Sequence, residues 1–227
     1  MLSIEDVFSR FNEIGCCSFA TLGGRGGVSS RIAHFFAWDE EGLYLRTMTV
    51  KPFYRQLIEG GRLSVCGEKT TMPCSWDEDN LPQFQPGYMV RVSGDVRLLT
   101  LEEVERKAAA SELFNVATYD MAKYPETRVF VLESAWGELY DYDYNMVGRD
   151  HKLLRERFAW GGAEVERPGL TISDACIGCG ACAEACSVRA IVPGKPYKIR
   201  GERCDECGKC AHVCPVGAIG GKGIPSA

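Results

Sequence analysis

The amino-acid sequence predicts a mainly β domain followed by a small cysteine-rich domain. Strand-like runs, separated by turns that contain glycine and aspartate, recur from residue 17 to residue 143. Eight of the 12 cysteines then fall in the short segment from Cys176 to Cys214. At 227 residues the chain is long enough for one sizeable core and one small appended module.

Composition and charge exclude several classes of function. The chain is 45% hydrophobic and 25% charged, which is typical of a folded globular protein. Its net charge of −5 offers no broad attraction to nucleic acid or to an anionic membrane, so we expect neither as a partner. The start of the chain lacks the features of a secretory signal, and no stretch approaches the about 20 apolar residues of a membrane span. We therefore expect a cytoplasmic protein.

The N-terminal part of the chain contains the expected strands. After a predicted helix over 4–14, capped by Ser3, the pattern changes to β-branched and aromatic runs bounded by turns. The expected strands are 17–22, 28–38, 43–48, 63–67, 88–99, 128–133 and 136–143. About six antiparallel strands with few helices predict a small barrel.

Three further helices are expected around these strands. The first covers 51–59, between two strands. The second begins after Thr100 and reaches about residue 114, because Thr100 and Glu103 form a capping box. The third is a charged helix around 150–158, which precedes a stretch rich in glycine and proline.

The clustered cysteines occur in two runs with identical spacing. Cys-x2-Cys-x2-Cys-x3-Cys begins at Cys176 and begins again at Cys204. Such a repeat is typical of a module with two [4Fe–4S] clusters, in which the fourth cysteine of each run ligates the other cluster. We therefore assign two crossed ligand sets: Cys176, Cys179, Cys182 and Cys214 for cluster 1, and Cys186, Cys204, Cys207 and Cys210 for cluster 2.

With these two runs, residues 169–221 resemble the bacterial-type 2[4Fe–4S] ferredoxins. The resemblance implies a small α+β domain that exchanges electrons one at a time with a redox protein. Zinc bound by Cys-x2-Cys pairs is the alternative, but an ion with four ligands does not explain a doubled run of four cysteines.

A second resemblance rests on short runs in the first domain. These are Ser30 to Phe36, Gly42 to Lys51, Gln56-Leu57 and Val90 to Gly94. On them, residues 5–142 resemble the FMN-binding split barrels of the pyridoxamine 5′-phosphate oxidase type. The resemblance implies a six-stranded split β-barrel with flanking helices, a bound FMN and a homodimer.

The residues also provide a physical argument for a flavin phosphate site. A phosphate that carries close to two negative charges favours an arginine fork, a lysine and hydroxyl donors, which Arg31, Lys51, Thr47 and Thr49 can supply. The resemblance implies that Arg31 and Lys51 contact the phosphate and that backbone at 32–33 and 46–47 approaches the flavin. The candidate cofactor-binding residues are Arg31, Ile32, Ala33, His34, Arg46, Thr47, Thr49, Lys51 and Gln56. His34 is equally compatible with a packed histidine, and Gln56 with a helix surface; no catalytic residue is identified.

Together these features predict a barrel over residues 1–158, a linker over 159–169 and a ferredoxin-like domain over 170–227. A flavin handles one or two electrons, whereas each cluster exchanges one. We therefore expect an iron–sulfur flavoprotein oxidoreductase of an anaerobic cytoplasm that reduces a small organic substrate. The alternatives are an electron-transfer protein without a substrate, which serves a redox protein partner, and a barrel that binds no flavin.

Overall fold

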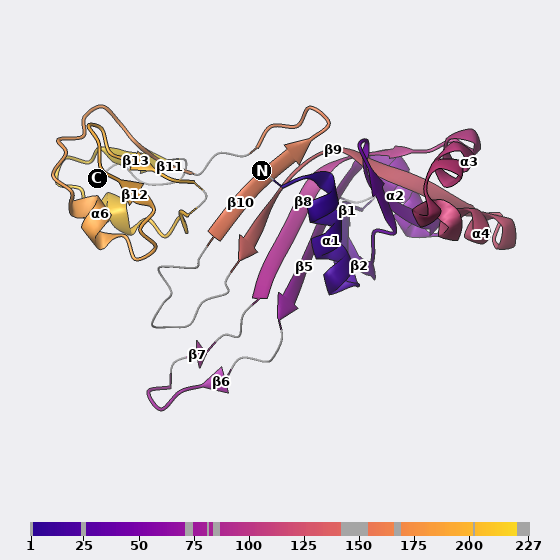
Figure 1. Ribbon diagram of the computed structural model, residues 1–227, viewed down its shortest axis with the longest axis horizontal. Helices are drawn as coiled ribbons and strands as arrows, with labels where there is room; N and C mark the ends of the chain where they lie inside the picture. Colours follow the sequence, from indigo (N-terminus) through magenta and orange to yellow (C-terminus); the bar gives the residue numbers. More distant parts are fainter. Residues whose placement is uncertain are drawn as a thin grey trace. The chain divides into compact units, whose positions relative to one another are not determined.

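The computed structural model is shown in Figure 1. It describes residues 2–23, 26–70, 75–80, 82–83, 87–141, 154–165, 169–201 and 203–221. The chain divides into two compact units. Unit 1 comprises Met1–Lys69, Met89–Glu138 and Arg157–Val165, and unit 2 comprises Thr70–Tyr88, Leu139–Glu156 and Glu166–Ala227.

One large β-sheet dominates the fold. Its path runs β2-β1-β5-β8-β9-β4-β3, and β10 pairs with β9 off this path. The bounds are β1 (Cys17–Leu22), β2 (Val28–Ala33), β3 (Ala37–Asp39), β4 (Gly42–Met48), β5 (Arg62–Thr70), β8 (Gly87–Leu98), β9 (Thr127–Asp141) and β10 (Leu154–Trp160). The pairs β1–β2, β1–β5, β3–β4 and β4–β9 are antiparallel. This sheet confirms the predicted mainly β class, with eight described strands rather than about six.

The first helices form where the sequence predicts them. Helix α1 (Ile4–Ile14) begins with a capping box between Ser3 and Asp6, and its buried face contains Val7, Phe8 and Phe11. The ring of Phe11 lies 5.3 Å from that of Phe35, so α1 packs on the core of unit 1. Helix α2 (Pro52–Gly60) has a proline in its first turn and ends before Gly61, whose positive φ terminates the helix.

Three of the expected strands differ from the structure. The strand expected over 28–38 is interrupted at 34–36, because β2 and β3 lie at opposite ends of the strand order and the chain must leave the sheet between them. The adjacent side chains Phe35 and Phe36 are both buried there, which an alternating strand does not allow. The two strands expected over 128–143 form one strand, β9.

The predictions for the later helices also differ from the structure. Helix α3 (Leu101–Ala110) begins at the predicted Thr100 capping box but ends at Ala110; the short helix η1 (Glu112–Phe114) and α4 (Asn115–Lys123) follow it. Helices α3 and α4 lie side by side at one end of unit 1 (Figure 1). The prediction of a charged helix around 150–158 is wrong for residues 154–158, which belong to strand β10. Residues 150–153 lie outside the described residues. Strand β10 extends to Trp160, whose indole donates to the carbonyl of Leu132 at 3.0 Å.

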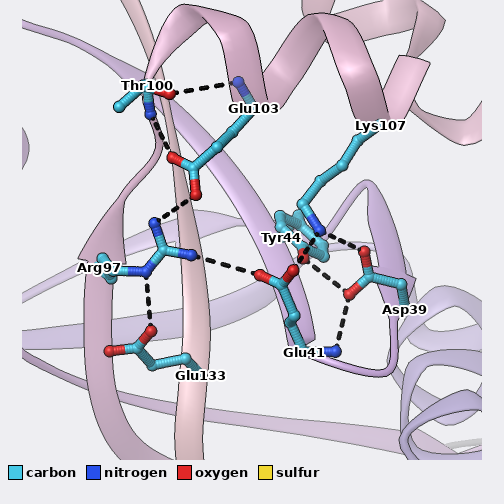
Figure 2. A network of polar contacts seen from close by, with 8 residues as sticks. All are labelled: Asp39, Glu41, Tyr44, Arg97, Thr100, Glu103, Lys107 and Glu133. Carbon is cyan, nitrogen blue, oxygen red and sulfur yellow. Dashed lines mark hydrogen bonds and ion pairs between the residues drawn. The ribbon is translucent and has the colours of Figure 1, made fainter. Parts of the chain in front are cut away.

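A polar network ties α3 to the sheet in unit 1, as Figure 2 shows. Arg97 on β8 contacts three carboxylates, those of Glu133 at 2.9 Å, Glu103 at 2.9 Å and Glu41 at 3.3 Å. The buried Lys107 ammonium of α3 lies 2.6 Å from Asp39 and 3.1 Å from Glu41. Burial alone would raise the pKa of Asp39, but hydrogen bonds from Lys107, Tyr44 and the Glu41 backbone outweigh it, so this pKa lies below its usual value.

We expect Lys107→Met to lower the free energy of unfolding by about 3 kcal/mol, because it removes the buried ammonium group that pairs with the half-buried carboxylate of Asp39. Lys69→Met is the control, since Lys69 forms an exposed pair with Glu13 and its loss costs below about 1 kcal/mol. Ionised Asp39 stabilises the fold above its unfolded pKa of about 3.9, and this contribution disappears as the pH falls through the folded pKa. Denaturant unfolding should therefore show the full loss of stability in Lys107→Met at pH 7 and a smaller loss near pH 3. Equal losses in Lys107→Met and Lys69→Met would contradict this prediction.

Unit 2 contains the cysteine runs and has the internal symmetry of the sequence repeat. Its short helices α6 (Ala181–Ala185) and α7 (Lys209–His212) begin at equivalent positions of the two runs, each after a glycine with positive φ, Gly180 or Gly208. Its two-stranded sheets pair β11 (Leu170–Ile172) with β14 (Ile219–Gly221), β12 (Ile191–Val192) with β13 (Lys198–Ile199), and β6 (Ser75–Trp76) with β7 (Pro82–Gln83). The elements from β11 to β14 form the small α+β domain that the sequence predicts, whereas β6 and β7 belong to a segment that the sequence prediction placed in the first domain.

Among the described residues, no helix has the length and apolar character needed to cross a membrane.

Candidate cluster and cofactor sites

Each of the two predicted cysteine ligand sets lines its own pocket in unit 2. Residues lining the first pocket include four cysteines: Cys176, Cys179, Cys182 and Cys214. The second pocket includes Cys186, Cys204, Cys207 and Cys210. Each pocket thus takes three cysteines from one run and the fourth from the other run. Apolar side chains such as Ile172 and Ile219 complete the first pocket. The second pocket has apolar residues such as Leu170 and Ile199 and also the charged residues Asp205, Glu206 and Lys209.

The backbone around these pockets suits thiolate ligands. The N–H groups of Ala190 and Ala218 each donate to a cysteine sulfur earlier in the chain, that of Cys186 and that of Cys214, at 3.3 Å. The two bonds are related by the internal repeat, and a third links the N–H of Glu206 to the Cys204 sulfur at 3.4 Å. Hydrogen bonds to sulfur stabilise thiolates and are one means by which a protein tunes an iron–sulfur cluster.

Burial raises the pKa of the Cys204 thiol, and the N–H of Glu206 opposes this effect. Burial likewise raises the pKa of Cys182 and Cys210. Iron binds the thiolate, so these sites release protons when they bind metal. In the described part of the chain, no three His, Cys, Asp or Glu side chains gather as the ligands of one metal ion do. Four cysteines instead line each of the two pockets in unit 2, and a four-iron cluster takes four cysteine ligands.

A separate cavity in unit 1 gathers six of the nine predicted flavin contacts. It has a volume of about 280 Å³ and lies where the end of β2, strand β4 and the start of α2 meet. The six predicted residues that line it are Ile32, Ala33, His34, Arg46, Thr47 and Lys51. Thr47 is buried, whereas Lys51 is exposed just before α2.

Three residues that the sequence did not single out also line this cavity, namely Met48, Asp120 and Thr127. The carboxylate of Asp120 on α4 lies 2.5 Å from Nε of Arg46. The guanidinium of Arg46 also lies over the ring of Phe36, 5.2 Å from its centroid. Asp120 therefore fixes the position of Arg46. Thr127 reaches the cavity because it pairs with Met48 in the β4–β9 register.

The other three predicted residues do not line the cavity. Arg31 is half-buried on β2, and its guanidinium donates to Thr21 Oγ1 at 2.7 Å and to Gln56 Oε1 at 2.5 Å. Gln56 is half-buried in this polar network rather than on an exposed helix surface. The hydroxyl of Thr49 donates to the carboxylate of Glu126. These three side chains already have protein partners.

A larger cavity of about 640 Å³ lies elsewhere in unit 1, between α3, α4 and the strands β8 and β9. Its walls are mainly apolar, with residues such as Leu99, Val104 and Met121, and it contains none of the predicted site residues. We therefore locate the candidate flavin site in the smaller cavity, where predicted cationic and hydroxyl side chains converge.

The chain thus joins a mainly β unit to a unit with two cysteine-lined pockets. Residues 175–218 match the family model described as the 4Fe-4S dicluster domain. The C-terminal part of the chain is therefore a 4Fe–4S dicluster domain. No curated protein matches the sequence.

Three solved structures are similar to the N-terminal part of this chain. A NimC/NimA family protein from Clostridium acetobutylicum is 16% identical; the match covers 70% of this chain and 94% of that one, with a TM-score of 0.50. A putative 5-nitroimidazole antibiotic resistance protein from Bacteroides thetaiotaomicron is 12% identical, with 62% and 86% covered and a TM-score of 0.43. The heme storage protein HutZ from Vibrio cholerae is 14% identical, with 57% and 87% covered and a TM-score of 0.41. The first of these supports the split-barrel fold of the N-terminal region.

Proposed function

We propose that the protein is an iron–sulfur flavoprotein oxidoreductase that passes electrons between two [4Fe–4S] clusters and FMN and reduces a small organic substrate. One observation carries the proposal: a single chain joins a 4Fe–4S dicluster domain to a split barrel whose cavity gathers six of nine predicted flavin contacts. Joining the two in one chain keeps electron donor and acceptor at high effective concentration.

We assign the cluster ligands to the crossed sets that line the two pockets. Cysteines Cys176, Cys179, Cys182 and Cys214 would hold cluster 1, and Cys186, Cys204, Cys207 and Cys210 would hold cluster 2. The N–H groups of Ala190 and Ala218 would stabilise the charge on two of these sulfurs. A redox protein would deliver or accept the electrons, and the cytoplasm of an anaerobic cell suits these ligands because it keeps thiols reduced.

The residues around the barrel cavity fit a flavin phosphate. Bound FMN supplies the conversion of single-electron transfer into two-electron hydride chemistry. Because Asp120 already pairs with Arg46, we assign the phosphate charge to Lys51, with the Thr47 hydroxyl as a further donor. The exposed side chain of Ile32 would cover part of the ring system and exclude water. Arg31 and Gln56 would support this site through β2 and α2 rather than touch the phosphate.

We further propose that the protein forms a homodimer through the exposed face of β1 and β2. Leu22 and Val28 pair across these strands, and Ile32 lies on the same face of β2 as Val28. These three apolar side chains are 57%, 74% and 70% exposed. A row of large apolar residues on an edge strand is typical of an interaction surface. Because Ile32 also lines the candidate flavin cavity, the partner subunit would lie next to the cofactor.

The substitution Val28→Asp should convert the dimer into a monomer, since it places a charge on this apolar face beside Leu22. Size-exclusion chromatography with light scattering measures the change. Leu101→Asp is the matched control, because Leu101 is 58% exposed on α3, away from β2. A wild-type monomer, or a dimer that survives Val28→Asp, would contradict the proposed interface.

Anaerobic purification, followed by measurement of iron, sulfide and FMN per chain, tests the proposed function. Two four-iron clusters predict about eight irons, with one FMN per chain. This result would justify a screen of small oxidised organic compounds as electron acceptors. Eight irons without flavin would overturn the assignment of the barrel cavity.

A further inference from the structure

The loop between the first two cysteines of the second run departs from the repeat. Residues Asp205 and Glu206 occupy the positions that Ile177 and Gly178 have in the first run. Gly178 has φ +74°, and Glu206 keeps the same left-handed conformation at φ +55°. Glycine adopts this conformation without strain, whereas other residues with a Cβ atom do so at a cost. Glu206 must therefore be held there by other contacts.

Two side chains from the ends of β9 and β10 provide these contacts within unit 2. Arg155 donates to the Glu206 carboxylate at 3.0 Å, and the backbone N–H of Gly169 donates to its other oxygen at 3.2 Å. The Tyr140 hydroxyl donates to Asp205 at 3.2 Å. The guanidinium of Arg155 lies over the Tyr140 ring, 5.2 Å from its centroid. We call these two pairs, Tyr140–Asp205 and Arg155–Glu206, the loop clamp.

The loop clamp acts on the surroundings of a cluster ligand. In its left-handed conformation, Glu206 directs its N–H to the sulfur of Cys204 at 3.4 Å. The ring of Tyr140 packs against the apolar group formed by Val188, Ala190 and Cys204. The clamp also places the charges of Arg155, Asp205 and Glu206 beside the second pocket only, because Ile177 and Gly178 have no charge at the matching positions of the first run. Hydrogen bonds to sulfur, nearby charge and solvent access all set cluster potentials.

We propose that Tyr140 and Arg155 are positioning residues for cluster 2, which hold the loop of Cys204 to Cys207 and give cluster 2 a reduction potential different from that of cluster 1. The inference rests on the proposed crossed ligand sets. It goes beyond them because it makes the two clusters inequivalent through residues outside the cysteine runs. Cluster 2 would then have a fixed place in the order of electron transfer.

Redox titration of the intact protein, followed by electron paramagnetic resonance, tests the proposed effect of the loop clamp on the reduction potential of cluster 2. Arg155→Met removes a positive charge and should lower one of the two midpoint potentials, whereas Glu206→Gln removes a negative charge and should raise the same one. The other potential should stay unchanged in both variants. Lys195→Met is the control, because Lys195 is an exposed cation of the same unit that lines neither cysteine pocket and should move neither potential.

Release of iron to a chelator tests whether the loop clamp holds the loop of Cys204 to Cys207 in place. Arg155→Met should release half of the iron about tenfold faster, because the left-handed Glu206 is no longer held. In the double variant Arg155→Met with Glu206→Gly, release should return to the wild-type rate, since glycine needs no support at this φ. Wild-type protein that contains only about half of the expected iron before the chelator is added would contradict the ligand assignment. A fully loaded Arg155→Met variant with wild-type potentials and wild-type release would overturn the loop clamp alone.

Discussion

A protein that carries both Cys182→Ala and Cys214→Ala should keep about four irons, although the two cysteines belong to different runs. Both line the first pocket, so the double variant loses cluster 1 and keeps cluster 2. The matched variant, Cys182→Ala with Cys186→Ala, changes two cysteines of the same run. It should lose both clusters, because Cys186 lines the second pocket.

Iron and sulfide analysis of anaerobically prepared protein measures both variants. Ligation within each run predicts the reverse result, with no cluster in the first double variant and one in the second. Alanine is used because serine can itself ligate iron through its oxygen. The reverse result would contradict the crossed ligand sets, and folding of each variant is checked by the circular dichroism of the barrel.

Lys51→Ala should weaken FMN binding by about 10-fold to 100-fold. The ammonium group would form a charge-assisted hydrogen bond with the phosphate, and the loss of such a bond costs about 1.5–3 kcal/mol. Lys51 is exposed at the start of α2, so the free energy of unfolding should change little. Fluorescence titration of the flavin-free protein gives the dissociation constant.

Riboflavin separates the phosphate contact from the rest of the site, because it has the ring system of FMN and no phosphate. Its affinity should be the same in the wild-type protein and in Lys51→Ala. Lys69→Ala is the control for loss of an exposed lysine elsewhere in unit 1, on β5. Equal weakening of FMN and riboflavin, or no weakening of either, would contradict the assignment of Lys51.

Local signals explain what the sequence predicts correctly. The capping boxes at Ser3 and Thr100 begin helices at the expected residues, because a cap depends only on neighbours three positions away. The grouping of the cysteines around two pockets agrees with the spacing within the two short runs and their repeat, while the ligation of clusters by these cysteines stays a prediction. These features need no knowledge of distant contacts.

Features that depend on distant partners were missed or misplaced. Strand β10 has charged residues that favour a helix by local propensity, but pairing with β9 makes it a strand. The hydrogen bond between Arg31 and Gln56 joins residues 25 positions apart, and Asp120 reaches Arg46 from a helix 74 positions away. No local pattern marks such pairs. For the same reason no sequence pattern indicates that Tyr140 and Arg155 hold the second cysteine loop.

The most direct test of the account is electron transfer between the clusters and the flavin of the same molecule. Flash reduction of the anaerobic holoprotein, followed at flavin and cluster wavelengths, should show flavin reduction at a rate that does not depend on protein concentration. The rate should collapse in the variant Cys182→Ala with Cys186→Ala, which keeps the barrel cavity and should keep FMN. Two results would contradict the account. One is a rate of flavin reduction that rises in proportion to protein concentration, and the other is an unchanged rate in the variant without clusters.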